Sequence, residues 1–235
     1  MSDLRVALVA EGPTDAIVIE AVLKALLPRP FVLTQLQPEP TLPKLGNGWG
    51  GVLRWCRNFA TQGHIRFEDD PTLPGFDLFV IHVDADVAEC AYADVSAEIA
   101  SIALQCGWPA LPNSVQCPPP TKSVDIVRTC VLSWAGIPAA GPKTVLCVPS
   151  KAIDAWLAAA SLAEGHVLRN GLECNLNVGA QLAALPVAER IKKARREYLS
   201  RQGTVTVNWP AVRAHCTQAE RFSTEVAGVD LAGTS

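Results

Sequence analysis

The sequence lacks several features that would indicate a particular cellular setting. None of its eight cysteines stands at C-x-x-C spacing to another, so we expect buried free thiols in a reducing compartment, not a zinc site or a disulfide framework. No stretch approaches the ~20 apolar residues of a membrane span. The N-terminal apolar run stops at Glu11, too early for a secretory signal. These absences predict a cytoplasmic protein that does not bind membranes.

Two nucleotide-binding motifs are also missing. Residues 10–14 read A-E-G-P-T and contain one glycine where the dinucleotide fingerprint G-x-G-x-x-G needs three. No GxxxxGK[ST] sequence occurs anywhere in the chain, so a P-loop ATPase site is excluded.

What the sequence does contain is enough apolar material for a sizeable core. The 235 residues are 49% hydrophobic with a mean hydropathy of +0.20, which excludes a disordered chain and fits one domain, or one domain with a small appendage. The net charge of −3 argues against an indiscriminate nucleic-acid coat protein. The charge is uneven: residues 1–150 hold 15 acidic and 10 basic side chains, whereas residues 151–235 hold 8 and 10.

Buried apolar runs alternate with segments of helical periodicity. We expect strands at residues 4–10, 31–36, 76–83 and 144–148, and helices at residues 14–27, 49–61, 88–106, 122–134 and 151–160. Residues 107–121 contain five prolines and should form an irregular loop. The alternation predicts an α/β fold, a Rossmann-like domain with a mainly parallel sheet and right-handed crossovers.

The strand signal fades after residue 162, and the rest of the chain has a helical pattern. One helix is expected over residues 187–201. Another should be capped by Asn208, with Pro210 near its start, and should run to about residue 226. The sequence therefore predicts a sheet domain at residues 1–162 and a C-terminal helical appendage at residues 163–235.

The first of these C-terminal helices is strongly basic. Its candidate nucleic-acid-binding residues are Arg190, Lys192, Lys193, Arg195 and Arg196. A cluster of this kind can bind phosphates, but it can equally be a solvated helix face. Both interpretations stay open.

Polar residues follow three of the expected strands where each one ends. They are Glu11 with Asp15, Asp84 with Asp86, and Ser150 with Lys151 and Asp154. Adjacent parallel strands lie ~4.8 Å apart, so carboxylates at neighbouring ends could share a divalent cation, and Mg²⁺ prefers such oxygen ligands.

Each of these residues also has a plainer interpretation. Asp15 and Asp154 could simply stabilise the helix starts, and Ser150 could be an N-cap. His82, within a buried strand, is expected to be a core histidine with satisfied hydrogen bonds.

Together these motifs resemble the TOPRIM domain. The resemblance rests on a strand followed by Glu11-Gly12-x-Thr14-Asp15 and a helix, and on a later strand ending Asp84-x-Asp86. Over roughly residues 4–160 the chain is similar to OLD-like nucleases and to short stand-alone TOPRIM proteins of bacteria. The segment from Ser150 to Trp156 resembles their Ser-x-Glu-x-Trp segment, with Asp154 in place of the usual glutamate.

The resemblance implies a metal-dependent nuclease that cleaves DNA or RNA, with a role in phage defence or DNA repair. It assigns one or two Mg²⁺ or Mn²⁺ ions to Glu11, Asp84 and Asp86, with Asp15 and Asp154 as further ligands. Glu11 would be a ligand or a general base, and Lys151 would neutralise charge on the phosphate. Any ATPase partner would be a separate chain, because this chain has no P-loop.

Two other functions remain as alternatives. The first is a non-catalytic TOPRIM subunit or adaptor that binds nucleic acid. The second is a phosphohydrolase of small metabolites that uses the same acidic strand ends. A topoisomerase is not expected, because no tyrosine is conspicuously placed as a nucleophile: Tyr92 and Tyr198 are the two in the chain.

Overall fold

The computed structural model describes residues 3–39, 41 and 44–231. Its strands are β1 (Leu4–Val9), β2 (Phe31–Gln37), β3 (Leu78–His82) and β4 (Thr144–Cys147). Its α-helices are α1 (Pro13–Leu26), α2 (Trp49–Ala60), α3 (Tyr92–Val95), α4 (Ala97–Gln105), α5 (Thr121–Ala135), α6 (Asp154–Ser161), α7 (Val178–Ala184), α8 (Arg195–His215) and α9 (Thr217–Ala227). Short 3-10 turns include η2 (Ala85–Glu89), η3 (Val167–Arg169) and η4 (Leu172–Cys174).

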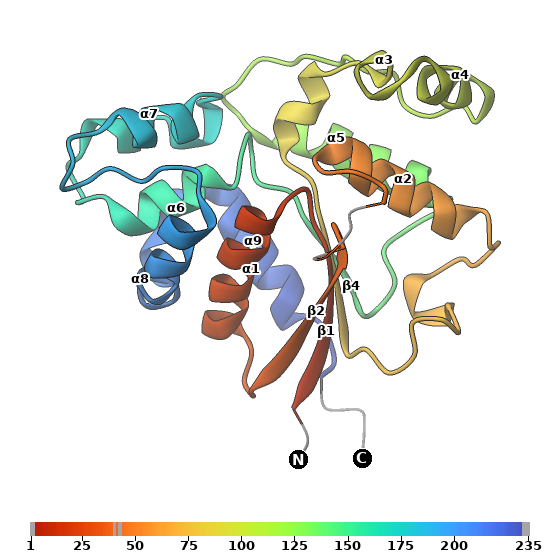
Figure 1. Cartoon of the computed structure of the whole chain (residues 1–235), viewed down its shortest axis with the longest axis horizontal. Coiled ribbons are helices and arrows are strands. Elements are labelled where there is room, and N and C mark those ends of the chain that lie inside the picture. The colour runs from red at the N-terminus through yellow and green to blue at the C-terminus, as the bar shows by residue number, and fades with distance from the viewer. Residues whose placement is uncertain (1–2, 40, 42–43, 232–235) are drawn as a thin grey trace.

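The four strands form one parallel sheet in the order β2-β1-β3-β4. Helices α1, α6, α8 and α9 cover one face, and α2 and α5 cover the other (Figure 1). This is a three-layer α/β fold compatible with the Rossmann-like class, as the alternating pattern predicts.

The central strands are continuous apolar runs because both of their faces are covered. Along β1, Val6 and Leu8 face the core that contains α1 and α8, whereas Ala7 and Val9 face the core that contains α2 and α5. The helices after residue 162 thus share a hydrophobic core with β1 and β3. No helix in the described part of the chain has the length and apolar character that crossing a membrane requires.

The prediction of a single helix over residues 88–106 is wrong. The chain instead forms turn η2, then α3 and α4, which are separated at Ser96. Ser96 is extended, with φ of −175°, and its hydroxyl accepts a hydrogen bond from the Ile99 amide at 3.1 Å. The serine acts as an N-cap, which favours a new helix start over a continuous helix.

The expected boundaries of the C-terminal helices are also wrong. Helix α8 begins at Arg195, not at residue 187, and it continues through Pro210. A proline inside a helix costs about 3 kcal/mol, but the buried Trp209 packs edge-to-face on Trp156, with ring centroids 5.3 Å apart. Asn208 does not cap a helix, because it lies inside α8, where its Nδ2 donates to the Ala160 carbonyl at 2.8 Å. Packing decides the course of this helix.

The expectation of free thiols fails for two cysteines. Cys117, in the proline-rich loop, forms a disulfide with Cys174, at the end of η4. Four of the remaining cysteines are buried, but Cys90 is only half-buried and Cys106 is exposed. Cys117 and Cys174 are 57 positions apart, so a search for local cysteine spacing could not find the pair.

Candidate functional site

Acidic side chains from two neighbouring strand ends meet beyond the carboxyl edge of the sheet. Glu11 lies two residues after β1, and Asp84 lies two residues after β3. The parallel register of these strands pairs Val9 with Ile81. As a result, Glu11 Oε1 accepts a hydrogen bond of 2.7 Å from the Asp84 amide. The sequence-based prediction that these two residues come together is confirmed.

The Asp84 carboxylate is held by contacts with two other parts of the chain. Its Oδ1 accepts a hydrogen bond of 2.9 Å from the Ile153 amide and lies 3.2 Å from His82 Nε2. The Ile153 amide belongs to the residue just before α6, so this carboxylate joins the end of β3 to the start of the helix that follows β4. Asp84 is only 7% exposed.

Asp15 and Asp86 complete the acidic group from the adjacent turns. Asp15 is buried in the first turn of α1, where Thr14 Oγ1 lies 3.4 Å from its Oδ1. Asp86 is in η2, and its amide donates to the Lys151 carbonyl at 3.1 Å. We use the name acidic cluster for Glu11, Asp15, Asp84 and Asp86.

Burial raises the pKa of every member of the acidic cluster, and repulsion from other members adds to the rise for Glu11 and Asp84. Burial and the Asp84 charge raise the pKa of Glu11 to about 8, although the His82 charge and the Asp84 amide act against the rise. Burial, with Asp15 and Asp86 nearby, raises the pKa of Asp84 well above its usual range. Burial likewise raises the pKa of Asp15 and Asp86. Ionising all four together therefore requires a compensating positive charge.

Lys193 supplies part of that charge. Its Nζ lies 3.4 Å from Asp154 Oδ2, and its charge lowers the pKa of Asp15, Asp84 and Asp86. Burial lowers the pKa of Lys193, but the charges of Asp154, Asp15 and Asp84 outweigh it and the net shift is upward. The basic segment from Arg190 to Arg196 thus brings one ammonium group, that of Lys193, to the acidic cluster.

Lys151, the predicted charge-neutralising lysine, has a different environment. It is only 3% exposed, and its Nζ forms an ion pair with Glu89 of η2. Its charge reaches the cluster as one of the influences that lower the pKa of Asp86. A buried ammonium already paired with a carboxylate is less available to a phosphate than Lys193, whose side chain is 53% exposed.

Asp154 has protein partners for both of its carboxylate oxygens. The Tyr198 hydroxyl donates to Oδ1, and Lys193 faces Oδ2. Asp154 opens α6, as expected, but Ser150 does not cap this helix: it lies outside the helix start, and its buried hydroxyl has no partner among the described residues. The N-cap interpretation of Ser150 is wrong.

Sequence reasoning missed the site contacts of His82 and Tyr198. His82 is fully buried, as predicted, but only its Nε2 has a partner within the described residues, so its hydrogen bonds are not all satisfied. It stands two residues before Asp84, a spacing that puts both on one face of a strand and could have indicated the contact. Tyr198 gave no such signal, because only the packing of α8 against α6 brings it to Asp154.

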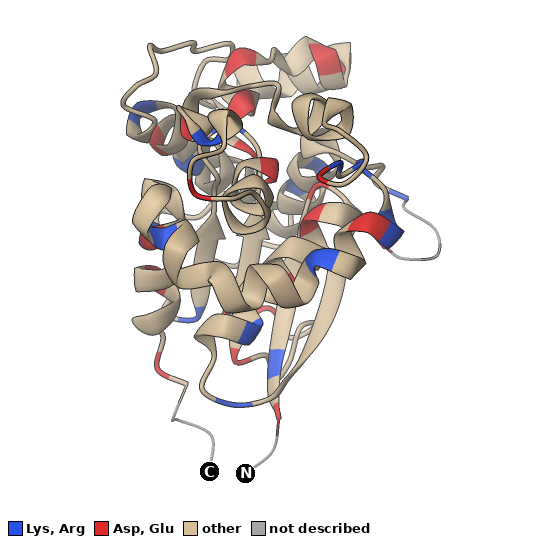
Figure 2. Cartoon of the chain, turned by 90° about the vertical axis from the view of Figure 1, so that its left-hand side faces the viewer, with Lys and Arg blue, Asp and Glu red and all other residues tan. Residues whose placement is uncertain are grey.

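The other basic residues of the segment lie outside the acidic cluster. Arg190 Nε donates to the Leu185 carbonyl at 3.1 Å, and Lys192, Arg195 and Arg196 are exposed. Figure 2 shows basic and acidic positions interspersed over this side of the molecule, without a broad face of one sign among the described residues. The described basic residues on this side of the molecule therefore form no extended basic face.

Arg195 lines a groove beside the first turn of α1. The groove has a volume of about 700 Å³ and lies between the N-terminal turns of α1, strand β2 and the start of α8. Ile17, Leu33 and Leu199 give it apolar walls, and Gln35 gives it an amide. Pro13, two residues before Asp15, also lines it. Glu20 and Glu39 also line the groove, and none of the acidic-cluster residues does.

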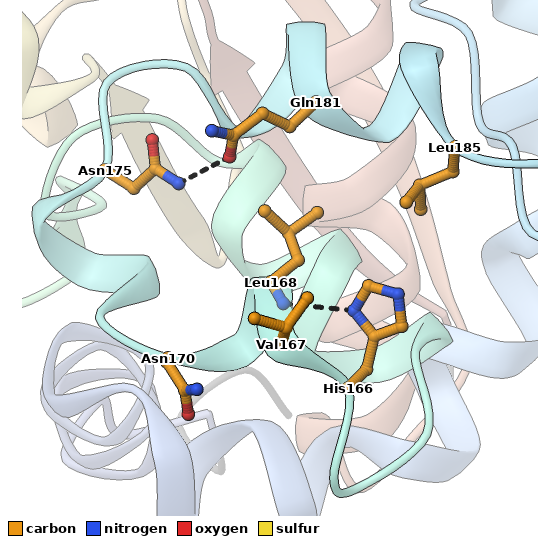
Figure 3. A pocket seen from close by; sticks show the side chains of 7 residues that line it. All are labelled: His166, Val167, Leu168, Asn170, Asn175, Gln181 and Leu185. Carbon is orange, nitrogen blue, oxygen red and sulfur yellow. Dashed lines mark hydrogen bonds between the residues drawn. The ribbon is translucent and has the colours of Figure 1, made fainter.

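A smaller cavity of about 380 Å³ lies among residues 166–185 (Figure 3). Several of its polar groups bond to one another or to the backbone. His166 Nδ1 accepts a hydrogen bond from the Leu168 amide at 3.1 Å, and Asn175 Nδ2 donates to Gln181 Oε1 at 2.7 Å. No acidic-cluster residue lines this cavity, which is therefore separate from the candidate site.

The side chains of the acidic cluster are of the type that binds a divalent cation, but they are not arranged around a common point. Carboxylate oxygens are the ligands that Mg²⁺ and Mn²⁺ prefer, and the pKa values of these carboxylates are raised by burial first, despite the nearby charges of His82 and Lys193. Within the residues that the structure describes, however, no three His, Cys, Asp or Glu side chains are grouped so that they could hold a metal ion. Binding would require side-chain movement in the cluster.

Comparison with known proteins adds no family assignment: no family model matches the chain, and neither a curated protein nor a solved structure shows significant similarity to it.

Proposed function

We propose that this protein is a Mg²⁺- or Mn²⁺-dependent nuclease with a TOPRIM-like sheet domain, acting on phosphodiester bonds of DNA or RNA. The observation that carries the proposal is the meeting of Glu11, Asp15, Asp84 and Asp86 at adjacent strand ends, with Lys193 facing them. Four carboxylates crowded into a largely buried place are costly unless a cation binds among them. The location is the usual one for a ligand site in an open parallel sheet.

Each residue has a role that follows from its position. Asp84 and Asp86 offer carboxylate oxygens to the cation, and Glu11 serves as a further ligand or as the general base. With its pKa at about 8, Glu11 is mostly protonated at neutral pH without a cation, and its ionised form, which grows as the pH rises or a cation binds, is the one that accepts a proton from water. Lys193 is placed to stabilise negative charge that develops on the phosphate. When bound, the divalent cation polarises the phosphate and makes a nearby water more acidic.

The nucleic-acid substrate is supported by the surroundings of the cluster. Arg195 lies two residues after Lys193 and lines a groove beside the first turn of α1, so it offers a second cation to a nucleic-acid strand, although Glu20 and Glu39 line the same groove. A separate ATPase partner and a role in phage defence or DNA repair rest on the sequence resemblance alone and stay predictions.

Cleavage assays with matched variants test the proposal. Supercoiled plasmid, single-stranded DNA and RNA would be incubated with the full chain and Mg²⁺ or Mn²⁺. We expect turnover that is lost in Glu11→Gln and Asp84→Asn but kept in Glu98→Gln, an exposed glutamate on α4. Turnover that survives both cluster substitutions would refute the site. Activity confined to a generic phosphomonoester would instead indicate a metabolite phosphohydrolase.

A non-catalytic nucleic-acid adaptor is the second candidate function. It is favoured by Asp154, whose oxygens are both engaged by Tyr198 and Lys193 and are therefore not free for a second metal ion. The adaptor predicts binding of a labelled oligonucleotide without turnover, weakened by salt and by Arg195→Gln. Binding and turnover measured on the same preparation separate the two candidates.

A further inference from the structure

One edge of the sheet is a strand without the usual protection against pairing with another chain. β2 is the outermost strand beside β1, and its residues, F-V-L-T-Q-L-Q, carry no charge. Edge strands are normally blunted by lysine, by proline or by a covering segment, because their free backbone groups can pair with a further strand. β2 contains neither lysine nor proline. Its sequence therefore leaves this edge available for strand addition.

The hydrogen bonds of β1 show which backbone groups of β2 are free. Leu4 pairs with Phe31 in the parallel register, and the Leu4 amide donates to the Pro30 carbonyl at 2.9 Å. Alternate residues of β2 therefore bond to β1, and the N–H and C=O groups of Phe31, Leu33 and Gln35 point away from it. Within the described residues none of these outward groups has a hydrogen-bond partner.

The space beside this edge is open on both faces of the sheet. On the α1 face, the groove of about 700 Å³ is lined by Leu33 and Gln35. On the opposite face, Val32 is 56% exposed and Thr34 is also exposed. A further strand therefore has room to lie along β2.

β2 is complementary to a second copy of itself. In antiparallel pairing about a two-fold axis at Leu33, Val32 lies opposite Thr34 of the second copy, and Phe31 lies opposite Gln35 of the second copy. The three outward N–H groups of each copy, six in all, then donate to outward carbonyls of the other copy. The strand has no charged side chain, so no like charges oppose this register.

The residues that flank β2 favour the antiparallel direction. Arg29 precedes the strand by two positions, and Glu39 follows it by two. Antiparallel pairing places the start of one strand beside the end of the other, so Arg29 of one copy approaches Glu39 of the second copy. Arg29 makes one hydrogen bond among the described residues, to the Leu231 carbonyl at 2.8 Å, and its guanidinium has further N–H groups to offer. A parallel arrangement would bring like charges together.

We propose that the protein forms a two-fold symmetric homodimer through antiparallel pairing of β2, which joins the sheets of two copies into one continuous sheet. The interaction surface consists of the outward backbone groups of β2 and the exposed side chains of Val32 and Thr34. No residue of the acidic cluster belongs to this surface. The dimer can therefore be tested separately from the proposed function.

Sedimentation equilibrium of the full chain at micromolar concentrations tests the dimer with two variants that differ only at position 34. The like-charge variant, Val32→Glu with Thr34→Glu, places two acidic side chains opposite each other at both symmetric positions. We expect it to dimerise at least about 10-fold more weakly than the wild type. The opposite-charge variant, Val32→Glu with Thr34→Lys, places an acid opposite a base at both positions and should dimerise about as tightly as the wild type. Val32→Lys with Thr34→Lys is a second like-charge variant, should the first fail to fold.

The outcomes decide both the dimer and its register, with circular dichroism as the check that each variant is folded. A monomeric wild-type chain would overturn the proposal and leave the β2 edge to a different partner. A dimer that persists unchanged in a folded like-charge variant would overturn it by placing the interface elsewhere. Equal weakening in the like-charge and opposite-charge variants would overturn the pairing about Leu33. Weakening confined to the like-charge variants would support the proposal.

Discussion

At the scale of single residues, two lysines near the acidic cluster have different partners. Lys151 is buried against Glu89, whereas Lys193 is half exposed and lies beside Asp154. An ammonium that faces several carboxylates from the solvent side can also contact an incoming phosphate. An ammonium held in a buried ion pair would have to break that pair first.

We therefore expect Lys193→Met to reduce phosphodiester cleavage about 10²- to 10³-fold, the usual effect of removing one group that stabilises charge in the transition state. Lys122, an exposed lysine at the start of α5, gives the control, and Lys122→Met should stay near the wild-type rate. The measurement is the initial rate at saturating Mn²⁺. A folded Lys151→Met variant that loses activity while Lys193→Met keeps it would assign the role to Lys151 instead.

At the scale of elements, α7 approaches the start of α6 at a glycine. A Cβ placed on Gly179 would lie 2.8 Å from Asp154 Oδ2, closer than side chains normally come. The absence of a side chain at this position is what leaves room for the carboxylate that contacts Lys193 and Tyr198.

We expect Gly179→Ala to displace Asp154 and lower the free energy of unfolding by about 1–3 kcal/mol, as overpacking of a filled site usually does. Urea unfolding measures the loss. Gly203→Ala in α8 is the control, because nothing lies near its Cβ position among the described residues and alanine favours a helix. Equal stability of Gly179→Ala and the wild type would mean that Asp154 moves without cost.

The sequence predicted well those elements whose signal is local. The four strands are short buried apolar runs, and Glu11 and Asp84 follow two of them, so both the sheet and the meeting of these carboxylates could be expected. The course of the helix around Pro210 could not be predicted in this way, because the packing of Trp209 in the core outweighs the local cost of the proline.

The contribution of the C-terminal helices to the site could not be predicted for a similar reason. Tyr198 and Lys193 reach Asp154 only after α8 has packed against α1 and α6. Nothing in the local pattern of residues 190–201 encodes that long-range contact.

At the scale of the whole molecule, the raised pKa values of the acidic cluster make stability depend on pH. In the folded chain Glu11 titrates near pH 8, compared with 4.5 for an ordinary glutamate. Between these values the folded state holds more protons than the unfolded state, so the free energy of unfolding falls as the pH rises. Each pKa unit corresponds to about 1.4 kcal/mol.

We expect urea unfolding without divalent cations to show lower stability at pH 8 than at pH 5. Glu11→Gln should weaken this dependence, because it removes one of the shifted groups, and Glu98→Gln should leave it unchanged. Millimolar Mn²⁺ should restore stability at pH 8, since a ligand of the folded state stabilises it by mass action. A wild-type chain equally stable at both pH values would contradict the shifts.

The candidate site draws on residues from almost the whole length of the chain, from Glu11 to Tyr198. During synthesis on the ribosome, Glu11 and Asp84 emerge long before Lys193 and Tyr198 exist. A nascent chain therefore has the repelling acids without the ammonium group and the hydroxyl that face them. The full set of charges around Asp154 and the acidic cluster therefore exists only after translation has passed α8.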